Sequence, residues 1–228
     1  MCCLAATKVV FFDLYGTLVY QENPVTNEEV SEYLLQRNCE VSPQGLGASF
    51  AFVAFIDYPK YGYQDWHSFL SRVFWRLGTS IKEETLSYIV RLYESRPYRL
   101  YLDATDAVIR AKKSGLRTAI ITTGTRFIAE NAIRPIREHF NLIITGFEAG
   151  CDKSNPKMYL KAIEMLRVKP QEAIMIGDDF QLDYVMPKRL GMKAILLDRE
   201  GKSKDKTVDA IVRNLNEAIG IIIGRARS

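Results

Sequence analysis

Six polar residues follow short apolar segments and carry side chains suited to nucleophilic or metal chemistry. They are Asp13, Thr17, Thr122, Asp178, Asp179 and Asp183. Asp13 stands in the motif D-L-Y-G-T, where Gly16 permits a sharp turn and Thr17 supplies a hydroxyl. A single aspartate at the end of a strand is often only a turn or capping residue. The whole set, together with Lys153, indicates a site.

The acidic residues of G-D-D-F-Q-L-D, at positions 178, 179 and 183, would repel one another and Asp13 if they met in the fold. Such a cluster normally needs a cation, and ligation by oxygen atoms alone suits Mg²⁺. Asp179 and Asp183 could instead cap the following helix, and we expect Asp183 to be the more structural of the two. Lys153 would balance the charge beside a phosphate, a metal and a nucleophilic carboxylate.

These residues must be positioned by the apolar segments that precede them. Strand-like segments such as K-V-V-F-F, R-T-A-I-I and A-I-M-I alternate with helical patterns along the chain. Continuous apolar strands indicate burial on both faces, as in a parallel sheet. The alternation therefore predicts an α/β fold with a doubly wound, Rossmann-like parallel sheet. In such a sheet, ligands bind at the carboxyl ends of the strands.

The stretch from about residue 20 to residue 100 departs from this pattern and predicts an all-helical insert after the first strand. Four helices are expected, within residues 26–38, 46–55, 65–77 and 82–95. The predicted domains are an α/β core, residues 1–18 and 100–228, and a helical insert, residues 19–99. Aromatic residues of the insert, such as Tyr58 and Trp66, could line a cleft or pack within the insert.

Composition narrows the classes of function. The chain has 228 residues, a net charge of +4 and two histidines. The histidine count disfavours a histidine metal site or a Ser-His-Asp triad. So small a positive charge does not indicate a nucleic-acid partner, but it suits a small anionic substrate.

Four cysteines without a C-x-x-C pair predict a cytoplasmic location. No apolar stretch is long enough to predict a membrane partner. We expect a monomer or a homodimer.

Four motifs of this chain closely resemble, in the same order, those of the haloacid dehalogenase-like hydrolase superfamily. They are D-L-Y-G-T, T-T-G, K-x-x-P and G-D-x-x-x-x-D. The helical insert falls where that family carries its helical cap. The resemblance implies that Asp13 is a nucleophile that forms an aspartyl intermediate. It implies that Thr122 hydrogen-bonds the transferring group, and that Lys153 steadies Asp13 and the charge of the substrate.

The same resemblance implies a Mg²⁺ site. Its ligands would be Asp13, the main-chain carbonyl of Tyr15, and Asp178, with Asp179 and Asp183 as further candidates. The residues that the resemblance places near the substrate are Thr17, Thr123, Gly124 and Tyr159.

The first motif departs from that of the family's phosphatases. Those enzymes usually carry a second aspartate two residues after the nucleophile, which protonates the leaving alkoxide and then activates water. This chain has Tyr15 there, and a phenol with a pKa of about 10 is a poor base near neutral pH. The sequence D-x-Y-G-T is similar to that of L-2-haloacid dehalogenases, which expel a halide that needs no proton. Tyr159 also matches a tyrosine of those dehalogenases, or is a helix residue that packs on the core.

Other positions favour the phosphatases. The dehalogenases have a serine where this chain has Asp178, and they use a cap arginine that is missing between Arg37 and Arg72. Because the clustered acids would be costly without a metal, we predict Mg²⁺-dependent phosphatase-type hydrolysis of a small phosphorylated metabolite. One alternative is dehalogenase-like hydrolysis of a carbon–halogen bond, and a second is a weakly active or non-catalytic binding relative. With Tyr15 in place, aryl and acyl phosphates should react faster than alkyl phosphates.

Overall fold

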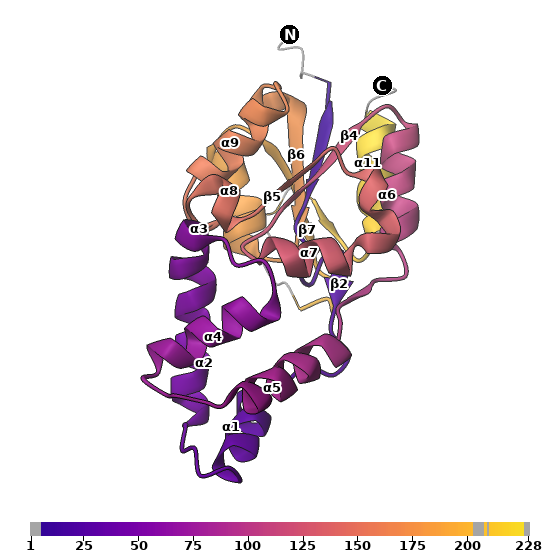
Figure 1. The fold of residues 1–228 in the computed structure, drawn as a ribbon. Coiled ribbons are helices and arrows are strands. Elements are labelled where there is room, and N and C mark those ends of the chain that lie inside the picture. Colours follow the sequence, from indigo (N-terminus) through magenta and orange to yellow (C-terminus); the bar gives the residue numbers. More distant parts are fainter. Residues whose placement is uncertain (1–5, 203–207, 209, 226–228) are drawn as a thin grey trace.

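The computed structural model describes residues 6–202, 208 and 210–225. Cys2 and Cys3 lie outside these ranges. A parallel sheet of six strands forms the centre of the core, in the order β5-β4-β1-β6-β7-β8 (Figure 1). The strands are β1 (Val9–Phe12), β4 (Arg117–Ile121), β5 (Leu142–Ile144), β6 (Ala173–Gly177), β7 (Lys193–Leu197) and β8 (Ile211–Val212). This arrangement confirms the predicted α/β fold with a parallel sheet.

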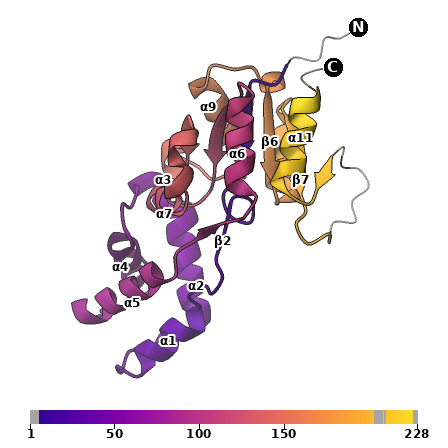
Figure 2. The ribbon, with the colours of Figure 1, turned by 90° about the vertical axis from the view of Figure 1, so that its right-hand side faces the viewer.

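Helices cover both faces of the sheet, which explains why its strands are apolar throughout. Val10 and Phe12 of β1 face a buried cluster that includes α6 (Ala104–Lys113) and α11 (Leu215–Arg225). Val9 and Phe11 face the opposite cluster, which includes α9 (Lys157–Met165). All four side chains are fully buried, and each such side chain contributes about 1.5–3 kcal/mol relative to an exposed one. Figure 2 shows α6 and α11 side by side on one face.

Short helical segments complete the core between these longer elements. They are α7 (Arg126–Ala132), η2 (Arg134–His139), α8 (Gly146–Ala149), η3 (Pro170–Glu172), the π-helical η4 (Phe180–Val185) and α10 (Met186–Arg189). Two of them, α7 and η4, directly follow the loops at the carboxyl ends of β4 and β6. They therefore position the loops that carry the predicted site residues.

The insert is helical, as predicted. It contains α1 (Asn27–Leu35), α2 (Pro43–Phe52), the π-helical η1 (Val53–Asp57), α3 (Tyr58–Tyr61), α4 (Trp66–Arg76) and α5 (Glu83–Ser95). Three of these helices begin at a side-chain cap, in which Thr26, Ser42 and Asp65 each accept a main-chain N–H three residues later. The helices enclose an apolar centre of their own that includes Leu34, Phe69 and Ile89. We refer to this insert as the cap.

Two short strands join the cap to the core. β2 (Val19–Tyr20) pairs antiparallel with β3 (Arg99–Leu100), so the chain leaves and re-enters the core at one place. We propose residues 19–99 as the cap, since both ends of this predicted range lie in the two strands of the ribbon. Within the described part of the chain, no helix has the length and apolar character needed to cross a membrane.

Candidate active site

The loops after β1, β4 and β6 meet at the carboxyl edge of the sheet. β1 lies between β4 and β6 and pairs in parallel with both. The main-chain N–H of Asp13 donates to the carbonyl of Ile176 over 2.9 Å, and that of Thr122 donates to Ile144 over 3.1 Å. These bonds extend the ladders by one residue past the strands. The sheet therefore places Asp13, Thr122 and Asp178 at one edge, as the sequence predicted.

Lys153 lies at the centre of this edge and joins two of its carboxylates. Its Nζ donates to Oδ1 of Asp13 and to Oδ1 of Asp183, each over 2.5 Å. The lysine is only 2% exposed. Burial by itself lowers the pKa of Lys153, but the charges of Asp13 and Asp183 raise it above its ordinary value. Lys153 is therefore an ammonium ion that is paired on two sides.

The loop that carries Lys153 is shaped by two side-chain turns. Oδ1 of Asp152 accepts the main-chain N–H of Ser154 over 2.7 Å, and Oδ1 of Asn155 accepts that of Lys157 over 3.0 Å. Asp and Asn favour such turns because their short side chains reach the main chain two residues later. Together they direct Lys153 inward just before α9 begins.

Asp13 and Asp178 are both affected by burial and by their acidic neighbours. Burial raises the pKa of Asp13 to about 7; Lys153 opposes this, whereas Asp183 and Asp178 add to it. Burial also raises the pKa of Asp178, with a further contribution from Asp183, while the hydroxyl of Thr17 donates to its Oδ1 over 3.0 Å and lowers it. Thr17 thus contacts an acid of the site directly.

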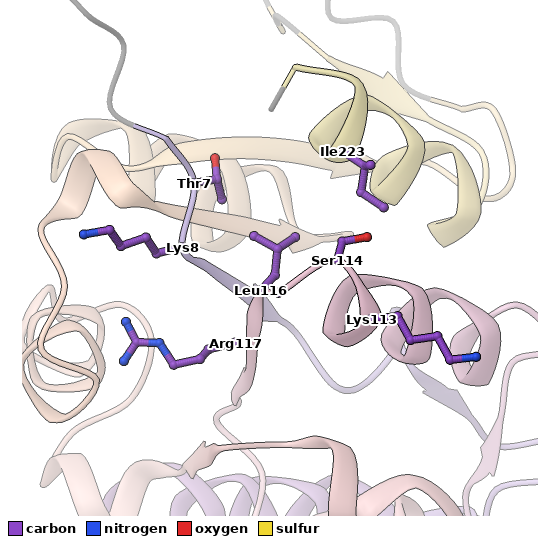
Figure 3. A pocket seen from close by; sticks show the side chains of 8 residues that line it. Thr7, Lys8, Lys113, Ser114, Leu116, Arg117 and Ile223 are labelled. Atoms are coloured by element: carbon purple, nitrogen blue, oxygen red, sulfur yellow. The ribbon is translucent and has the colours of Figure 1, made fainter. Parts of the chain in front are cut away.

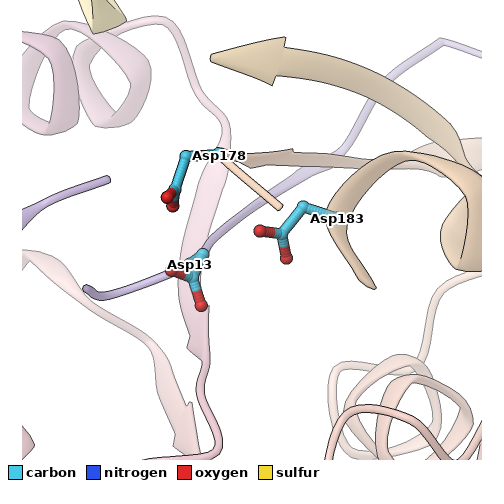
Figure 4. Close-up of side chains that lie close together, drawn as sticks. All are labelled: Asp13, Asp178 and Asp183. Atoms are coloured by element: carbon cyan, nitrogen blue, oxygen red, sulfur yellow. The ribbon is translucent and has the colours of Figure 1, made fainter. Parts of the chain in front are cut away.

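Three of the predicted metal ligands converge. Carboxylate oxygens of Asp13, Asp178 and Asp183 lie within 4.8 Å of one another, and Figure 4 shows the three side chains close together. A donor set made only of carboxylate oxygens fits a hard cation such as Mg²⁺. Close approach is possible because two neighbouring residues lack side chains. A Cβ atom at Gly16 (φ +74°) would lie 2.4 Å from Oδ2 of Asp178, and one at Gly177 would lie 2.2 Å from Cγ of Asp183.

Asp179 has a different role from these three acids. Its Oδ1 accepts the main-chain N–H groups of Gln181 and Leu182, each over 2.8 Å, and so caps η4. Asp183 also contacts this turn, because its Oδ2 accepts the N–H of Asp179 over 3.0 Å. Asp183 is completely buried. It therefore joins the helical turn to Lys153 as well as to the acidic group.

Tyr15 lies against the second motif. Its ring contacts that of Tyr98 with centroids 4.7 Å apart. A Cβ atom at Gly124 would come within 2.4 Å of the Tyr15 hydroxyl. Burial raises the pKa of Tyr15 well above 10, and Tyr98 and Asp13 add to the effect. The phenol therefore stays protonated at neutral pH and cannot serve as a base there.

The remaining predicted residues lie at the rim of the site or behind it. Thr122 is buried and its Oγ1 accepts the N–H of Gly124 over 3.1 Å, whereas Thr123 is half-buried. Tyr159 is fully buried in the apolar cluster beneath the sheet edge, and its hydroxyl donates to the carbonyl of Leu182 over 2.5 Å. These contacts match the second interpretation of Tyr159, a helix residue packed on the core.

Two contributors were missed by the sequence predictions. Arg199 donates to the carbonyl oxygens of Gly16 (3.3 Å) and Thr17 (2.7 Å), and both ends of its guanidinium are bound by Asp103. It therefore fixes the loop that carries the first motif. The position of Arg199 just after an apolar strand is a signal from which the sequence could have identified it. Tyr98, which contacts Tyr15, carried no such signal because it lies in the connection that follows the cap.

A separate cavity lies at the other edge of the sheet. It has a volume of 540 Å³ and is lined by residues that precede β1 and β4, among them Lys8, Lys113 and Leu116 (Figure 3). Since β1 runs from Val9 toward Asp13, this cavity is separated from the acidic group by the length of the strand. It belongs to the amino edge, where the loops of the predicted site are not found.

Comparison with known proteins supports the resemblance of the motifs. The family model described as haloacid dehalogenase-like hydrolase matches residues 7–191. The haloacid dehalogenase-like hydrolase domain-containing protein 3 of Bos taurus is 26% identical over 206 residues, which cover 83% of this chain and 81% of the relative. A glyceraldehyde 3-phosphate phosphatase of Pyrococcus furiosus is 38% identical over 95 residues, 40% of this chain and 39% of that protein.

Solved structures share the whole architecture. A 2-haloacid dehalogenase from Pseudomonas syringae pv. Tomato DC3000 superimposes with a TM-score of 0.72 over 96% of this chain and 99% of that chain, at 18% identity. At this identity, the likeness demonstrates a common fold of core and cap.

Proposed function

Since the chain belongs to the haloacid dehalogenase-like hydrolase family and is a hydrolase, we propose that it is a Mg²⁺-dependent phosphatase that acts on a small phosphorylated metabolite. The observation that carries this proposal is the convergence of Asp13, Asp178 and Asp183, two of which, Asp13 and Asp183, are bound by Lys153. The name of the Pyrococcus furiosus relative, glyceraldehyde 3-phosphate phosphatase, supports the same reaction class.

In the proposed reaction, a carboxylate oxygen of Asp13 attacks the phosphorus atom. The P–O bond to the leaving group breaks as the new P–O bond to Asp13 forms, and the leaving group departs with the electron pair. Water then attacks the phosphorus of the aspartyl phosphate, which releases inorganic phosphate and regenerates the carboxylate. Lys153 holds Oδ1 of Asp13, so Oδ2 is the oxygen oriented to attack.

The surrounding groups would stabilise the phosphoryl oxygens. The Lys153 ammonium balances the charge of Asp13 before its attack, and again when the carboxylate leaves phosphorus in the second step. Because Oγ1 of Thr122 already accepts the N–H of Gly124, its hydroxyl proton is available to a phosphoryl oxygen. Thr123 and Gly124 would contribute further contacts from the same loop. Thr122 and Lys153 are held in place by hydrogen bonds before the substrate arrives, so little reorganisation is needed.

The cation would be held by Asp13, Asp178 and the main-chain carbonyl of Tyr15, with Asp183 as a further candidate ligand, whereas Asp179 caps η4. Thr17 binds Oδ1 of Asp178, so the second oxygen of that carboxylate can face a cation. When bound, Mg²⁺ would neutralise charge on the transferring phosphoryl group and keep Asp13 ionised.

Dehalogenation is the second candidate, and Tyr15 is the observation that favours it. A protonated, buried phenol cannot replace the missing general base, whereas halide departure needs no proton. Two observations oppose dehalogenation. Asp178 is present although dehalogenation does not require it, and the cap has no arginine between Arg37 and Arg72. A weakly active binding relative remains the third candidate.

One paired assay separates the candidates. Phosphate release from p-nitrophenyl phosphate should require Mg²⁺, stop with EDTA and be lost in Asp13→Asn. Halide release from L-2-chloropropionate that persists in EDTA would instead favour the dehalogenase. Absence of both activities, with substrate binding retained, would favour the non-catalytic relative.

We further propose a cytoplasmic location and a monomeric or homodimeric state. Cys39 and Cys151 are free thiols, as a reducing compartment allows. Size-exclusion chromatography with light scattering would determine the oligomeric state.

A further inference from the structure

Two adjoining cavities lie where the cap meets the ribbon that joins it to the core. The smaller has a volume of 190 Å³ and is lined by Val25, by the amides of Gln21 and Asn27, and by aromatic rings. The larger, of 260 Å³, adds residues of α7, including Phe127. Four residues line both: Gln21, Trp66, Tyr93 and Tyr98.

Tyr98, which lines both cavities, contacts the loop that carries the nucleophile. The ring of Tyr98 contacts that of Tyr15, which stands two residues after Asp13 and lies over Gly124. On the cap side, the ring of Trp66 lies 4.5 Å from that of Tyr93 and 5.4 Å from that of Phe127. A group that extends from a phosphoryl at Asp13 past Tyr15 would therefore meet aromatic surface.

The smaller cavity offers no charge to a ligand. Of the described residues that line it, none is Lys, Arg, Asp or Glu. Three charged residues line the larger cavity, and two of them, Asp65 and Glu94, are acidic. The third, Arg96, is already engaged, because its two terminal nitrogens donate to the two carboxylate oxygens of Glu29 over 2.6 Å each. A charge that is buried without a partner is strongly unfavourable. The amides of Gln21 and Asn27 can hydrogen-bond a neutral polar group.

We infer that this cavity receives the leaving group and that the preferred substrates carry a small uncharged organic group on the phosphate. The inference rests on the proposed phosphatase function. The volume of 190 Å³ is about six times the ~30 Å³ that a water molecule occupies in the liquid. A short neutral chain or one aromatic ring fits this space, whereas a second phosphate or a carboxylate would lack a counter-ion.

The kinetic test compares phenyl phosphate with 4-carboxyphenyl phosphate. The carboxylate makes the phenol a slightly better leaving group, so a preference for phenyl phosphate cannot arise from leaving-group chemistry. We expect kcat/KM to be about tenfold or more higher for phenyl phosphate, mainly through KM. Equal values, or a preference for the charged compound, would overturn the inference.

A matched pair of variants places the effect at the cavity. Asn27→Lys adds a cation to the cavity wall and should reduce the preference for phenyl phosphate several-fold. Asn23→Lys makes the same change at an exposed position four residues earlier and should keep the wild-type ratio. If both variants shift the ratio equally, the selectivity comes from the overall charge of the protein and not from the cavity.

A binding test that needs no turnover separates this inference from the proposed function. Trp66 is the only tryptophan left in Trp75→Phe, and its fluorescence reports on the cavity. Benzyl alcohol should quench it at concentrations about tenfold lower than benzoate. Equal binding of the two overturns the inference even if phosphates are hydrolysed. Selective binding without any Asp13-dependent phosphate release would instead overturn the proposed function, and with it the identity of the group as a leaving group.

Discussion

The ring of Tyr15 occupies the space that a side chain at Gly124 would need. A Cβ atom at Gly124 would lie 2.4 Å from both the hydroxyl and Cε2 of Tyr15. The first and second motifs are therefore fitted to each other: the tyrosine that replaces a general base is accommodated by a glycine in the T-T-G loop.

Replacement of Tyr15 by Asp should restore the missing acid–base group. A carboxyl two residues after Asp13 can protonate an alkoxide, which the buried phenol with its raised pKa cannot do efficiently. We expect kcat for an alkyl phosphate such as glycerol 3-phosphate to rise about 10²-fold, with a smaller rise for p-nitrophenyl phosphate. Initial rates over a series of leaving groups would measure this.

The control is Tyr15→Phe, which keeps the ring and removes the hydroxyl. Because the phenol is not a base at neutral pH, this variant should leave kcat close to that of the wild type. If Tyr15→Phe abolishes turnover, the hydroxyl itself acts in catalysis and the interpretation of Tyr15 is wrong. A flat dependence of the wild-type rate on leaving-group pKa would contradict it as well.

Gly124→Ala should disturb the site through Tyr15. The new methyl group must displace the ring, which moves Tyr15 and the loop that holds Asp13. We expect kcat/KM to fall about tenfold, a cost of about 1.4 kcal/mol. In a Tyr15→Ala background the same substitution should cost almost nothing, since the two residues share one contact. Additive effects in this double-mutant cycle would show that Gly124 acts by another route.

The strand-end residues could be predicted because local patterns determine them. Continuous apolar segments end at Asp13, Thr122 and Asp178, and the parallel sheet brings these ends together. The helices of the cap were predictable for a similar reason, since residues that cap helix N-termini, such as Thr26 and Asp65, lie at their starts. The ends of the strands and the starts of the helices are thus determined by residues that lie close together in the sequence.

The division of roles between Asp179 and Asp183 was not predictable: Asp183 was expected to be the more structural of the two, but Asp179 is the residue that caps η4. Both are polar residues at the start of a helical segment, and only the π-helical turn η4 determines which one points toward Lys153. The contact between Tyr15 and Tyr98 depends on how the cap returns to the core through β3, which no local pattern encodes. Long-range contacts therefore account for what the sequence left open.

Lys153→Met should destabilise the protein as well as inactivate it. The variant leaves Asp183, which is completely buried, and Asp13 without their cation. The loss of one partner of a buried ion pair costs about 3–5 kcal/mol. Urea denaturation at neutral pH would measure the free energy of unfolding. Lys157→Met, at an exposed position of α9, is the control and should change stability little.

A second substitution tests the cause of this loss. Lys153→Met combined with Asp183→Asn removes one of the stranded charges and should recover part of the free energy of unfolding. If the double variant is less stable than Lys153→Met by the full cost of Asp183→Asn alone, the two residues are energetically independent and the ion pair contributes nothing.

Tyr58 is expected to hold the cap on the core. It lies in α3 and is only 1% exposed, and its hydroxyl contacts Oγ1 of Thr145 (3.0 Å) and accepts the main-chain N–H of Arg126 (2.7 Å). Tyr58→Phe leaves that N–H without an acceptor, at a cost of about 1–3 kcal/mol. Hydrogen exchange at the Arg126 amide should accelerate accordingly. Tyr61→Phe, at an exposed position of the same helix, should not change it.

Glu148 should make this junction sensitive to acid. Burial raises the pKa of Glu148, but the hydrogen bonds from Arg126 and Thr145 outweigh burial and hold the pKa below its ordinary value of 4.5. A carboxyl whose pKa is lower in the folded state contributes stability above its unfolded pKa and loses it as the pH falls through the folded value. Glu148→Gln should therefore lower the free energy of unfolding at pH 7, and the difference from the wild type should shrink steadily below pH 4.5.

Urea denaturation of the wild type and Glu148→Gln across this pH range measures the difference. Glu164→Gln, at an exposed site on α9, is the control. A difference that stays constant down to the acid-unfolding limit would mean that Glu148 acts through packing and not through its charge.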